Sequence, residues 1–417
     1  MVLWTNKKKT EIVSPAGNLE KLKFAVDFGA DAVYFGGQEL NLRMKTGNFS
    51  HEDIHQGIRY AHDAGARVIF LLNSYLHEDD IDRARHYIHE ISSYDFDGIM
   101  VSDPGMIMLV RESGLDVPLH LSTQMSTLNH LSIRFWQQMG IERIVLAREV
   151  TLDEIRKIRD HTDADIETFI HGALCVSYSG RCLLSRFLSG RDANQGSCSH
   201  PCRWKYSLVE EKRPGNHMDI IEHASGTEIL SSKDLCLIDH VPAYMDAGVN
   251  AFKIEGRMKS LYYTANTTRV YDHAARIAFE GGDYREWLPF WKKELDLISH
   301  RPYTDDLFNE FGDDAFSSLP YIKKVLFLGY RKTGEEPSRE AVTRIFNPVY
   351  RGEKVEAIYP IRDKEILDGE LIVENIWDDE NSVEMAQPGK EYLLRFDREV
   401  HPNAIIRRRL HEDGSNK

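Results

Sequence analysis

The sequence predicts an α/β fold class: a TIM-like (β/α)8 barrel with a Cys-rich insertion, followed by a small C-terminal all-β domain that is itself a barrel. Three observations support this prediction. Between residues 11 and 257, short β-branched runs alternate with stretches of helical period, which is typical of βα units around a parallel sheet. The alternation is interrupted after His171, and all five cysteines lie in the interruption. From residue 322 onward, the pattern changes to strands of alternating polarity separated by turns.

Eight strands are expected in the first domain. They are Glu11–Pro15, Ala32–Phe35, Arg67–Leu72, Gly98–Ser102, Pro118–Ser122, Arg143–Ala147, Ile166–His171 and Ala251–Glu255. Amphipathic segments between them predict helices, for example at Asn18–Phe28, Ile54–Ala64, Asp79–Ser92 and Leu152–Asp160, and glycines such as Gly29, Gly65 and Gly140 are expected to end helices. Eight such units fit a closed barrel better than an open doubly wound sheet. No Gly-x-Gly-x-x-Gly follows the first strand, which disfavours a dinucleotide site.

The expected domain limits follow from these patterns. The barrel should span residues 1–281, with the insertion at about 172–250. Residues 282–320 are interpreted as a helical linker with a helix at Trp287–Leu297, and residues 411–417 as a polar tail. The C-terminal β-barrel should span residues 321–410, with strands in VLFLGY, AVTRIFNPVY, EKVEAIYP, GELIVENIW and EYLLRF.

Composition indicates an ordinary globular protein, with 42% hydrophobic and 28% charged residues. The first ten residues, MVLWTNKKKT, lack the apolar core of a signal peptide, and no apolar run is long enough to span a membrane. We therefore expect a cytoplasmic protein with no membrane partner. Five cysteines, an odd number, argue against a disulfide framework and favour thiols that act as ligands or nucleophiles.

The net charge of −14 means that the molecule as a whole should repel polyanions, so a nucleic acid would need a local basic patch. Between residues 181 and 213, seven basic residues face three acidic ones, a net charge of +4, and Phe187, Trp204 and Tyr206 lie among them. RNA-binding surfaces use this mixture for phosphates and base stacking. A solvated loop with core aromatics explains the same pattern. The candidate RNA contacts are Arg181, Arg186, Arg203, Trp204 and Lys205.

Polar residues follow most of the predicted strands. Because the carboxyl ends of barrel strands meet at one rim, the set predicts a polar pocket there, although any single member can be a structural group. The set is Asn73, Asp103, Gln124, Arg148, Glu149, His171, Glu255 and Arg257.

The cysteines have the spacing Cys175-x6-Cys182-x15-Cys198-x3-Cys202-x33-Cys236. An iron–sulfur cluster needs four thiolates, and irregular spacing is common for clusters built into a large fold. Four cysteines also suit structural zinc, but zinc sites usually use short paired knuckles, and only Cys198 and Cys202 have that form. The spacing favours a cluster, with zinc or buried free thiols as the alternatives.

Residues 167–185 read ETFIHGALCVSYSGRCLLS and match the signature of the peptidase U32 family. The segments EIVSPAGN, DAVYFGG, NQGSCSHPCRWKY, SSKDLC and FKIEGRMKS extend the resemblance to roughly residues 10–275. That family contains collagenase-like proteins named as peptidases, ubiquinone-hydroxylation proteins, and enzymes that hydroxylate C5 of pyrimidines in ribosomal RNA or at the tRNA wobble uridine. The segment NQGSCSHPCRWKY with the following EEKRPG, and the two-domain length, most resemble the tRNA group.

The resemblance implies a tRNA uridine 5-hydroxylase that makes 5-hydroxyuridine with prephenate as the hydroxyl source. It also implies an iron–sulfur cluster, expected to be 4Fe–4S, whose ligands would be Cys175, Cys182, Cys236 and one of Cys202 and Cys198, with Cys202 favoured. The expected partners are tRNA and prephenate, and participation of a second U32 subunit is left open.

A U32 peptidase and a hydroxylase of ribosomal RNA or ubiquinone are the alternative functions. The chain has no His-Glu-x-x-His and no Gly-x-Ser-x-Gly. A thiol peptidase could use one cysteine with His171 or His200, but such a nucleophile does not require four further cysteines.

Roles in the predicted pocket follow from the chemistry of the proposed co-substrate. Prephenate carries two carboxylates, and planar guanidinium groups bind carboxylates bidentately, so Arg148 and Arg257 are the candidate anchors. His171 is a candidate acid or base, and Glu255 is expected to orient Arg257 or to carry a proton. An ion pair at the rim explains Glu255 and Arg257 equally well. The other predicted substrate-binding residues are Arg43, Lys45, Gln124 and Lys253.

Overall fold

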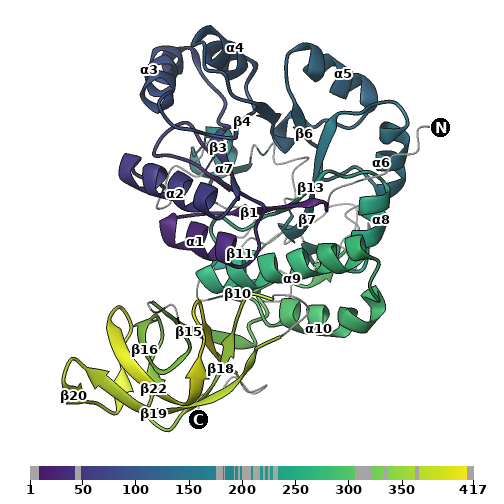
Figure 1. The fold of residues 1–417 in the computed structure, drawn as a ribbon. Coiled ribbons are helices and arrows are strands. Elements are labelled where there is room, and N and C mark those ends of the chain that lie inside the picture. Colours follow the sequence, from purple (N-terminus) through teal and green to yellow (C-terminus); the bar gives the residue numbers. More distant parts are fainter. Residues whose placement is uncertain are drawn as a thin grey trace.

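The structure is a computed structural model, shown in Figure 1. It describes residues 9–42, 48–174, 182, 184–191, 193–195, 198–199, 233–305, 321–332, 334, 336–361 and 366–410, and four short strands between residues 208 and 228. Arg43, Lys45, Cys175, Arg181, Cys202, Arg203, Trp204 and Lys205 lie outside the described residues.

The first domain is a closed parallel barrel, which confirms the predicted fold class. Each strand pairs with the next along the chain, and the last pairs with both the seventh and the first. All eight predicted strands are present, with ends that differ by a few residues. They are β1 (Glu11–Pro15), β2 (Ala32–Phe35), β3 (Arg67–Leu72), β4 (Gly98–Val101), β5 (Leu119–Leu121), β6 (Arg143–Val145), β7 (Asp165–Ala173) and β13 (Ala251–Ile254).

Helices surround the barrel because each connection between parallel strands must return along its outside (Figure 1). Their N-termini are capped by side chains such as Ser50, which accepts a hydrogen bond from the backbone nitrogen of Asp53. Gly29, Gly65 and Gly140 follow helices with positive φ, as expected. The helices are α1 (Leu19–Asp27), α2 (His51–Asp63), α3 (Ile81–Ile91), α4 (Pro104–Glu112), α5 (His130–Gln138), α6 (Leu152–Arg159), α8 (Val241–Asp246) and α9 (Leu261–Glu280).

The seventh strand is longer than predicted. The first part of β7 pairs with β13 inside the barrel, and its end pairs antiparallel with β12 (Asp234–Cys236), where the insertion returns. Strand β14 (Tyr303–Thr304) continues this extension of the sheet beyond β12. The described part of the insertion also includes α7 (Leu184–Ser189). Because β12 reaches the barrel through β7, its residues lie at the barrel's rim.

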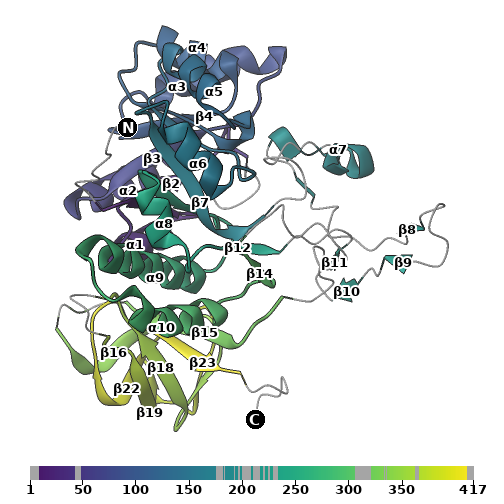
Figure 2. The same cartoon turned by 90° about the vertical axis from the view of Figure 1, so that its right-hand side faces the viewer.

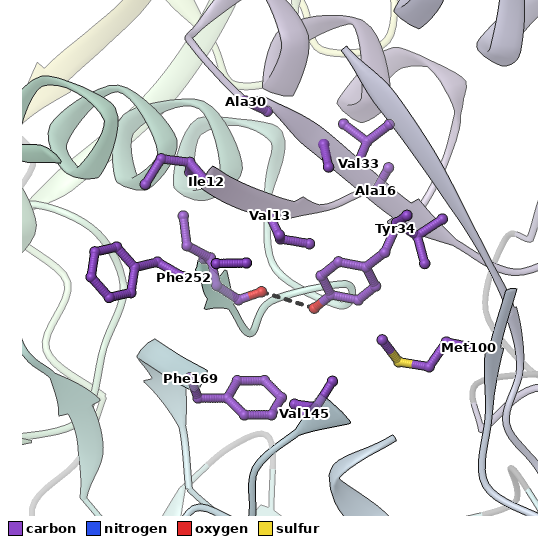
Figure 3. Packing of buried hydrophobic residues seen from close by; sticks show 14 of the residues in the cluster. Ile12, Val13, Ala16, Ala30, Val33, Tyr34, Met100, Val145, Phe169 and Phe252 are labelled. Carbon is purple, nitrogen blue, oxygen red and sulfur yellow. Dashed lines mark hydrogen bonds between the residues drawn. The ribbon is translucent and has the colours of Figure 1, made fainter. Parts of the chain in front are cut away.

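Aromatic and aliphatic side chains share the barrel interior with the buried charged pair of Lys253 and Glu167. Tyr34, Met100, Val145 and Phe169 approach one another from four different strands, as Figure 3 shows. Each is buried, with at most 7% of its surface exposed. The interior is therefore packed, as in other barrels of this type, and a reactive site is expected at the rim.

The C-terminal residues form a second barrel, made of antiparallel strands. Strand β18 pairs with both β23 and β19, which closes a ring of six strands and leaves no open edge within it. The strands are β15 (Val325–Arg331), β16 (Ser338–Ile345), β18 (Lys354–Ile358), β19 (Gly369–Asp378), β22 (Glu391–Val400) and β23 (Ile405–Arg409).

Helices α9 and α10 (Tyr284–Asp296) lie between the two barrels (Figure 2). The buried carboxylate of Glu294 in α10 accepts hydrogen bonds from Arg269 of α9, at 2.7 Å, and from Arg407 of β23, at 2.7 and 2.9 Å. Arg269 also donates to the carboxylate of Asp368 at 2.8 Å. These contacts join the barrels by a desolvated ionic cluster. No helix in the described residues is both long and apolar enough to cross a membrane.

Candidate active site

The polar residues predicted at the strand ends gather at one face of the barrel. Parallel strands have their carboxyl ends at the same rim, so residues distant in sequence meet there. The predicted site residues in the described part of the barrel are Arg148 after β6, Glu255 and Arg257 after β13, Gln124 after β5, and His171 within β7.

Tyr34 marks the point where several of these side chains converge. Its hydroxyl donates to the carbonyl oxygen of Ile254 at 2.8 Å, a bond drawn in Figure 3, and lies 3.5 Å from a carboxylate oxygen of Glu255. Burial and the charge of Glu255 raise the pKa of Tyr34 well above its usual value, while the charges of Arg257 and Arg148 act to lower it. Three predicted residues thus act on one hydroxyl, that of Tyr34, which was not among the predicted site residues.

Arg257 is oriented by neutral partners. Its guanidinium donates to the side-chain oxygen of Asn41 from both terminal nitrogens, at 3.3 Å, and to that of Asn48 at 2.8 Å. These bonds fix the plane of the fork without adding a negative charge. The loop after β1 also packs closely here, because a Cβ atom at Gly17 would lie 2.3 Å from the carbonyl oxygen of Arg257.

Lys253 lies inside the barrel, with only 3% of its surface exposed. Its ammonium donates to Glu167 at 2.6 Å and stands 4.3 Å from the centre of the Tyr34 ring. Arg143 also approaches Glu167, at 3.5 Å, and donates to Glu11 at 2.6 Å. Glu167 thus serves as the anionic partner of Lys253 in the interior, and substrate binding by Lys253 stays a prediction.

Arg148 and Gln124 differ in how they are held. The guanidinium carbon of Arg148 lies 4.2 Å from the centre of the Phe169 ring, a cation–π contact that leaves its hydrogen-bonding edge usable by a ligand. Gln124 is buried, and its side-chain oxygen accepts from the hydroxyl of Ser102 at 2.9 Å. Arg148 is therefore the better placed of the two to bind a carboxylate.

His171 is enclosed rather than exposed at the rim. Its Nδ1 lies 3.2 Å from the hydroxyl of Tyr271, and the rings of Tyr263, Tyr271 and Tyr303 surround it. Burial lowers the pKa of His171 to about 3. The imidazole is therefore neutral near pH 7, which suits a hydrogen-bonding role, and its role as an acid or base stays a prediction.

Cys236 lies beside His171, because the two residues are partners in the pairing of β12 with β7. Its sulfur is 3.6 Å from the hydroxyl of Tyr271. Burial raises the pKa of the Cys236 thiol to about 11. A thiol that stays protonated is a poor nucleophile, whereas binding to a metal removes the proton.

Two further cysteines lie in the described part of the insertion. Cys182 is buried and Cys198 is half-buried. Their segments are joined next to the cysteines, since the backbone nitrogen of Ser199 donates to the hydroxyl of Ser185 at 3.0 Å. Cys175 and Cys202 lie outside the described residues, and within the described ones no group of three or more metal-ligating side chains is placed to hold an ion.

The insertion touches the rim of the barrel. The backbone nitrogen of Tyr75, in the connection after β3, donates to the carbonyl oxygen of Asn194 at 3.3 Å. Arg186, the one predicted RNA contact that the structure describes, is exposed on α7. The site thus includes Tyr34, Asn41 and Asn48, which were not predicted individually, although Tyr34 lies in the DAVYFGG segment at the end of an expected strand.

Comparisons with known proteins agree with the resemblance found in the sequence. Residues 17–315 match the profile of peptidase family U32. The chain is 34% identical over 406 residues to the tRNA hydroxylation protein P1 of Bacillus subtilis (strain 168), across 96% of this chain and 95% of that protein. It is 40% identical over 325 residues to the 23S rRNA 5-hydroxycytidine C2501 synthase of Escherichia coli (strain K12), across 75% and 48%. A collagenase of Porphyromonas gingivalis (strain ATCC BAA-308 / W83) is 33% identical over 340 residues, across 76% and 80%.

Proposed function

Because the chain belongs to the peptidase U32 family, we propose that it is an RNA-hydroxylating enzyme. The observation that carries the proposal is similarity along nearly the whole chain, including the C-terminal barrel, to a protein named for tRNA hydroxylation. A relative named as an rRNA 5-hydroxycytidine synthase supports the same class of reaction. We assign the substrate as tRNA and the product as 5-hydroxyuridine at the wobble position.

Prephenate is our proposed source of the hydroxyl group, and the rim offers groups that suit it. The charges of Arg257 and Arg148 both act to lower the pKa of Tyr34, and we propose that a small dicarboxylate binds to both guanidinium groups. The amides of Asn41 and Asn48 hold the Arg257 fork in one orientation, which favours bidentate binding of a carboxylate. Glu255, 3.5 Å from that hydroxyl, is our candidate for moving a proton at the site.

We propose that an iron–sulfur cluster, of 4Fe–4S type, is held by Cys175, Cys182, Cys236 and one of Cys202 and Cys198. The chemistry of the donors fits such a group: Cys182 is buried, Cys236 is half-buried, and the Tyr271 hydroxyl is close enough to Cys236 to donate to a thiolate. When bound, the cluster would supply electron transfer beside β7. Zinc bound by the same cysteines is the alternative.

The experiment that tests the function is mass spectrometry of tRNA nucleosides from a strain lacking this protein. We expect loss of 5-hydroxyuridine and of nucleosides derived from it, with recovery when the wild-type gene is restored.

Because the chain is similar to a protein named collagenase, peptidase activity is the second candidate function. Cleavage of gelatin by lysates of the same strains separates the two. Unchanged nucleosides together with lost gelatin cleavage would reject our proposal in favour of the peptidase.

A further inference from the structure

A groove between the two barrels opens beside the candidate active site. Its volume is about 640 Å³. One wall follows β13 and includes Glu255 and Lys259, and the other wall comes from Lys323, Phe327 and Phe346 of the C-terminal barrel. Because Glu255 also approaches Tyr34, this interbarrel groove leads to the rim of the first barrel.

Aromatic faces form much of the groove wall on the C-terminal side. The rings of Phe327 and Phe346 are 5.0 Å apart between centroids, and Tyr321 lines the same wall. Phe346 is 38% exposed, and Met258 on the opposite wall is 54% exposed. Exposed flat apolar faces of this kind bind unpaired nucleobases by stacking.

The charge of the groove differs from that of the whole chain. The molecule carries a net charge of −14, yet the described residues that line the groove include Lys259 and Lys323 and only one acid, Glu255 at its inner end. Ser260, also in the lining, is the N-cap of α9, so the positive end of that helix dipole adds to the two lysines. Lys259 also pairs with the buried carboxylate of Asp234, at 3.8 Å, so the exposed Lys323 is the main cation that the groove offers to a phosphate group.

Strand addition by a peptide does not fit the groove. In this mode of recognition an extended peptide adds a strand to an open sheet edge. The strand at the groove wall, β15, is already paired on both sides, with β16 and β23. The exposed ring of Phe346 and the exposed ammonium of Lys323 remain available, and an aromatic face beside a cation is a combination that recognises a single-stranded nucleic acid.

We infer, resting on the proposed function, that the interbarrel groove binds an unpaired segment of the RNA substrate. One base stacks on Phe346, and the adjoining phosphates lie near Lys323 and Lys259. A neighbouring nucleotide is then directed toward Glu255 and Tyr34 at the barrel rim. The C-terminal barrel contributes a binding surface in this arrangement.

Fluorescence anisotropy with the full-length protein and a labelled, unmodified tRNA anticodon stem-loop tests the stacking contact. Phe346→Ala should weaken binding about tenfold, equivalent to about 1.4 kcal/mol. The matched control is Tyr350→Ala, which removes an exposed aromatic ring of the same barrel that does not line the groove. The control should bind within about twofold of wild type, and thermal melting should show that both variants are folded.

The salt dependence of binding tests the phosphate contact. Each phosphate neutralised on a single strand contributes about 0.7 to the slope of log affinity against log salt. Lys323→Gln should lower that slope by about this amount. Lys332→Gln, an exposed lysine of the same barrel outside the groove, should leave it unchanged.

The outcomes separate this inference from the proposed function. If the wild type binds the RNA and both groove variants bind it equally well, the groove assignment is wrong while the hydroxylase proposal stands. If a gelatin peptide binds with an affinity that depends on Phe346 and the RNA does not bind, the groove is a peptide site and the inference is overturned. Unchanged tRNA nucleosides in the deletion strain would reject the proposed function by an independent measurement.

Discussion

Single residues at the barrel rim owe their placement to partners that are distant in sequence. Arg257 is held by Asn41 and Asn48, more than 200 positions earlier in the chain. Three hydrogen bonds to two different amides require the spread of a planar fork. The side chain is thus presented in a defined orientation, and its shape as well as its charge should matter.

Arg257→Lys is expected to reduce tRNA hydroxylation at least tenfold while the protein stays folded. A lysine keeps the charge but cannot form the bidentate contact, and a hydrogen bond to a charged group contributes roughly 1.5–3 kcal/mol. Nucleosides from a complemented deletion strain report activity, and circular dichroism reports folding. Arg134→Lys, at an exposed site on α5, is the control. Normal hydroxylation by Arg257→Lys, or a loss explained by unfolding, would refute the anchoring role.

A second prediction at the residue scale concerns Gly172. Its φ is +113°, and a Cβ atom there would lie 2.4 Å from the carbonyl oxygen of Glu255. Gly172→Ala should lower the melting temperature by several degrees, because both the strain and the clash cost free energy. Gly114→Ala, with φ of +73° and nothing within 4 Å, carries the strain alone. Equal effects of the two substitutions would show that the close approach is unimportant.

The sequence could identify polar residues at strand ends but not their partners. Lys253 and Arg257 both occur in FKIEGRMKS, and from sequence alone both were assigned to substrate. In the structure, Lys253 points to Glu167 inside the barrel, while Arg257 meets neutral amides. The two side chains differ in their partners because Glu167 lies on the neighbouring strand β7, whereas Asn41 and Asn48 lie in the loop after β2. Those partners are set by the closure of the barrel, which no local pattern contains.

At the scale of elements, β7 links the two halves of the site. The strand was expected to end at His171, but it continues to Ala173 because β12 supplies hydrogen-bond partners from across the insertion. Strand periodicity was sufficient to find all eight barrel strands, since each is a local apolar run. It did not reveal β12, a three-residue strand whose pairing is entirely long-range.

The cysteines on these elements lead to a prediction about composition. Protein purified without oxygen should be brown and contain iron and acid-labile sulfide in nearly equal amounts. Cys236→Ser should lose most of both, because it removes the ligand that we propose at the end of β12. Comparing Cys198→Ser with Cys202→Ser then identifies the fourth ligand, since the spare cysteine can be replaced without loss of iron. Stoichiometric zinc without sulfide would refute the cluster.

For the whole molecule, the joint between the barrels depends on a buried carboxylate. Glu294 of α10 lies between Arg269 of α9 and Arg407 of the second barrel. Sequence patterns predicted both barrels, because strand and helix periods are local. They could not predict this joint, since its three members are spread over more than 130 positions of the chain. The arrangement of the barrels therefore had to come from the structure.

The same joint predicts how stability depends on pH. Burial alone would raise the pKa of Glu294, but hydrogen bonds from Arg407 and the charge of Arg269 lower it to about 2. Its ionised form therefore stabilises the fold above the ordinary pKa of 4.5, and this contribution, roughly 3 kcal/mol, is lost as the pH falls toward 2. Urea midpoints of the wild type should fall over that range.

Glu294→Gln should have a lower urea midpoint at pH 7 and a weaker dependence on pH. The matched control is Glu374→Gln, which removes a carboxylate from pairs at the surface of the second barrel and should keep the wild-type pH dependence. If Glu294→Gln shows the same pH dependence as the wild type, Glu294 is not the group responsible.

The order of the strands along the chain also determines which part of the barrel is synthesised first. Strand β13, which closes the ring by pairing with β1 and β7, is translated after all five cysteines have been synthesised. Until then β1 and β7 are open edges, which are prone to aggregate in a nascent chain. The cysteines are thus made before the framework that surrounds them exists. Any cofactor they bind must be inserted either into an unfinished barrel or after the last strand has closed it.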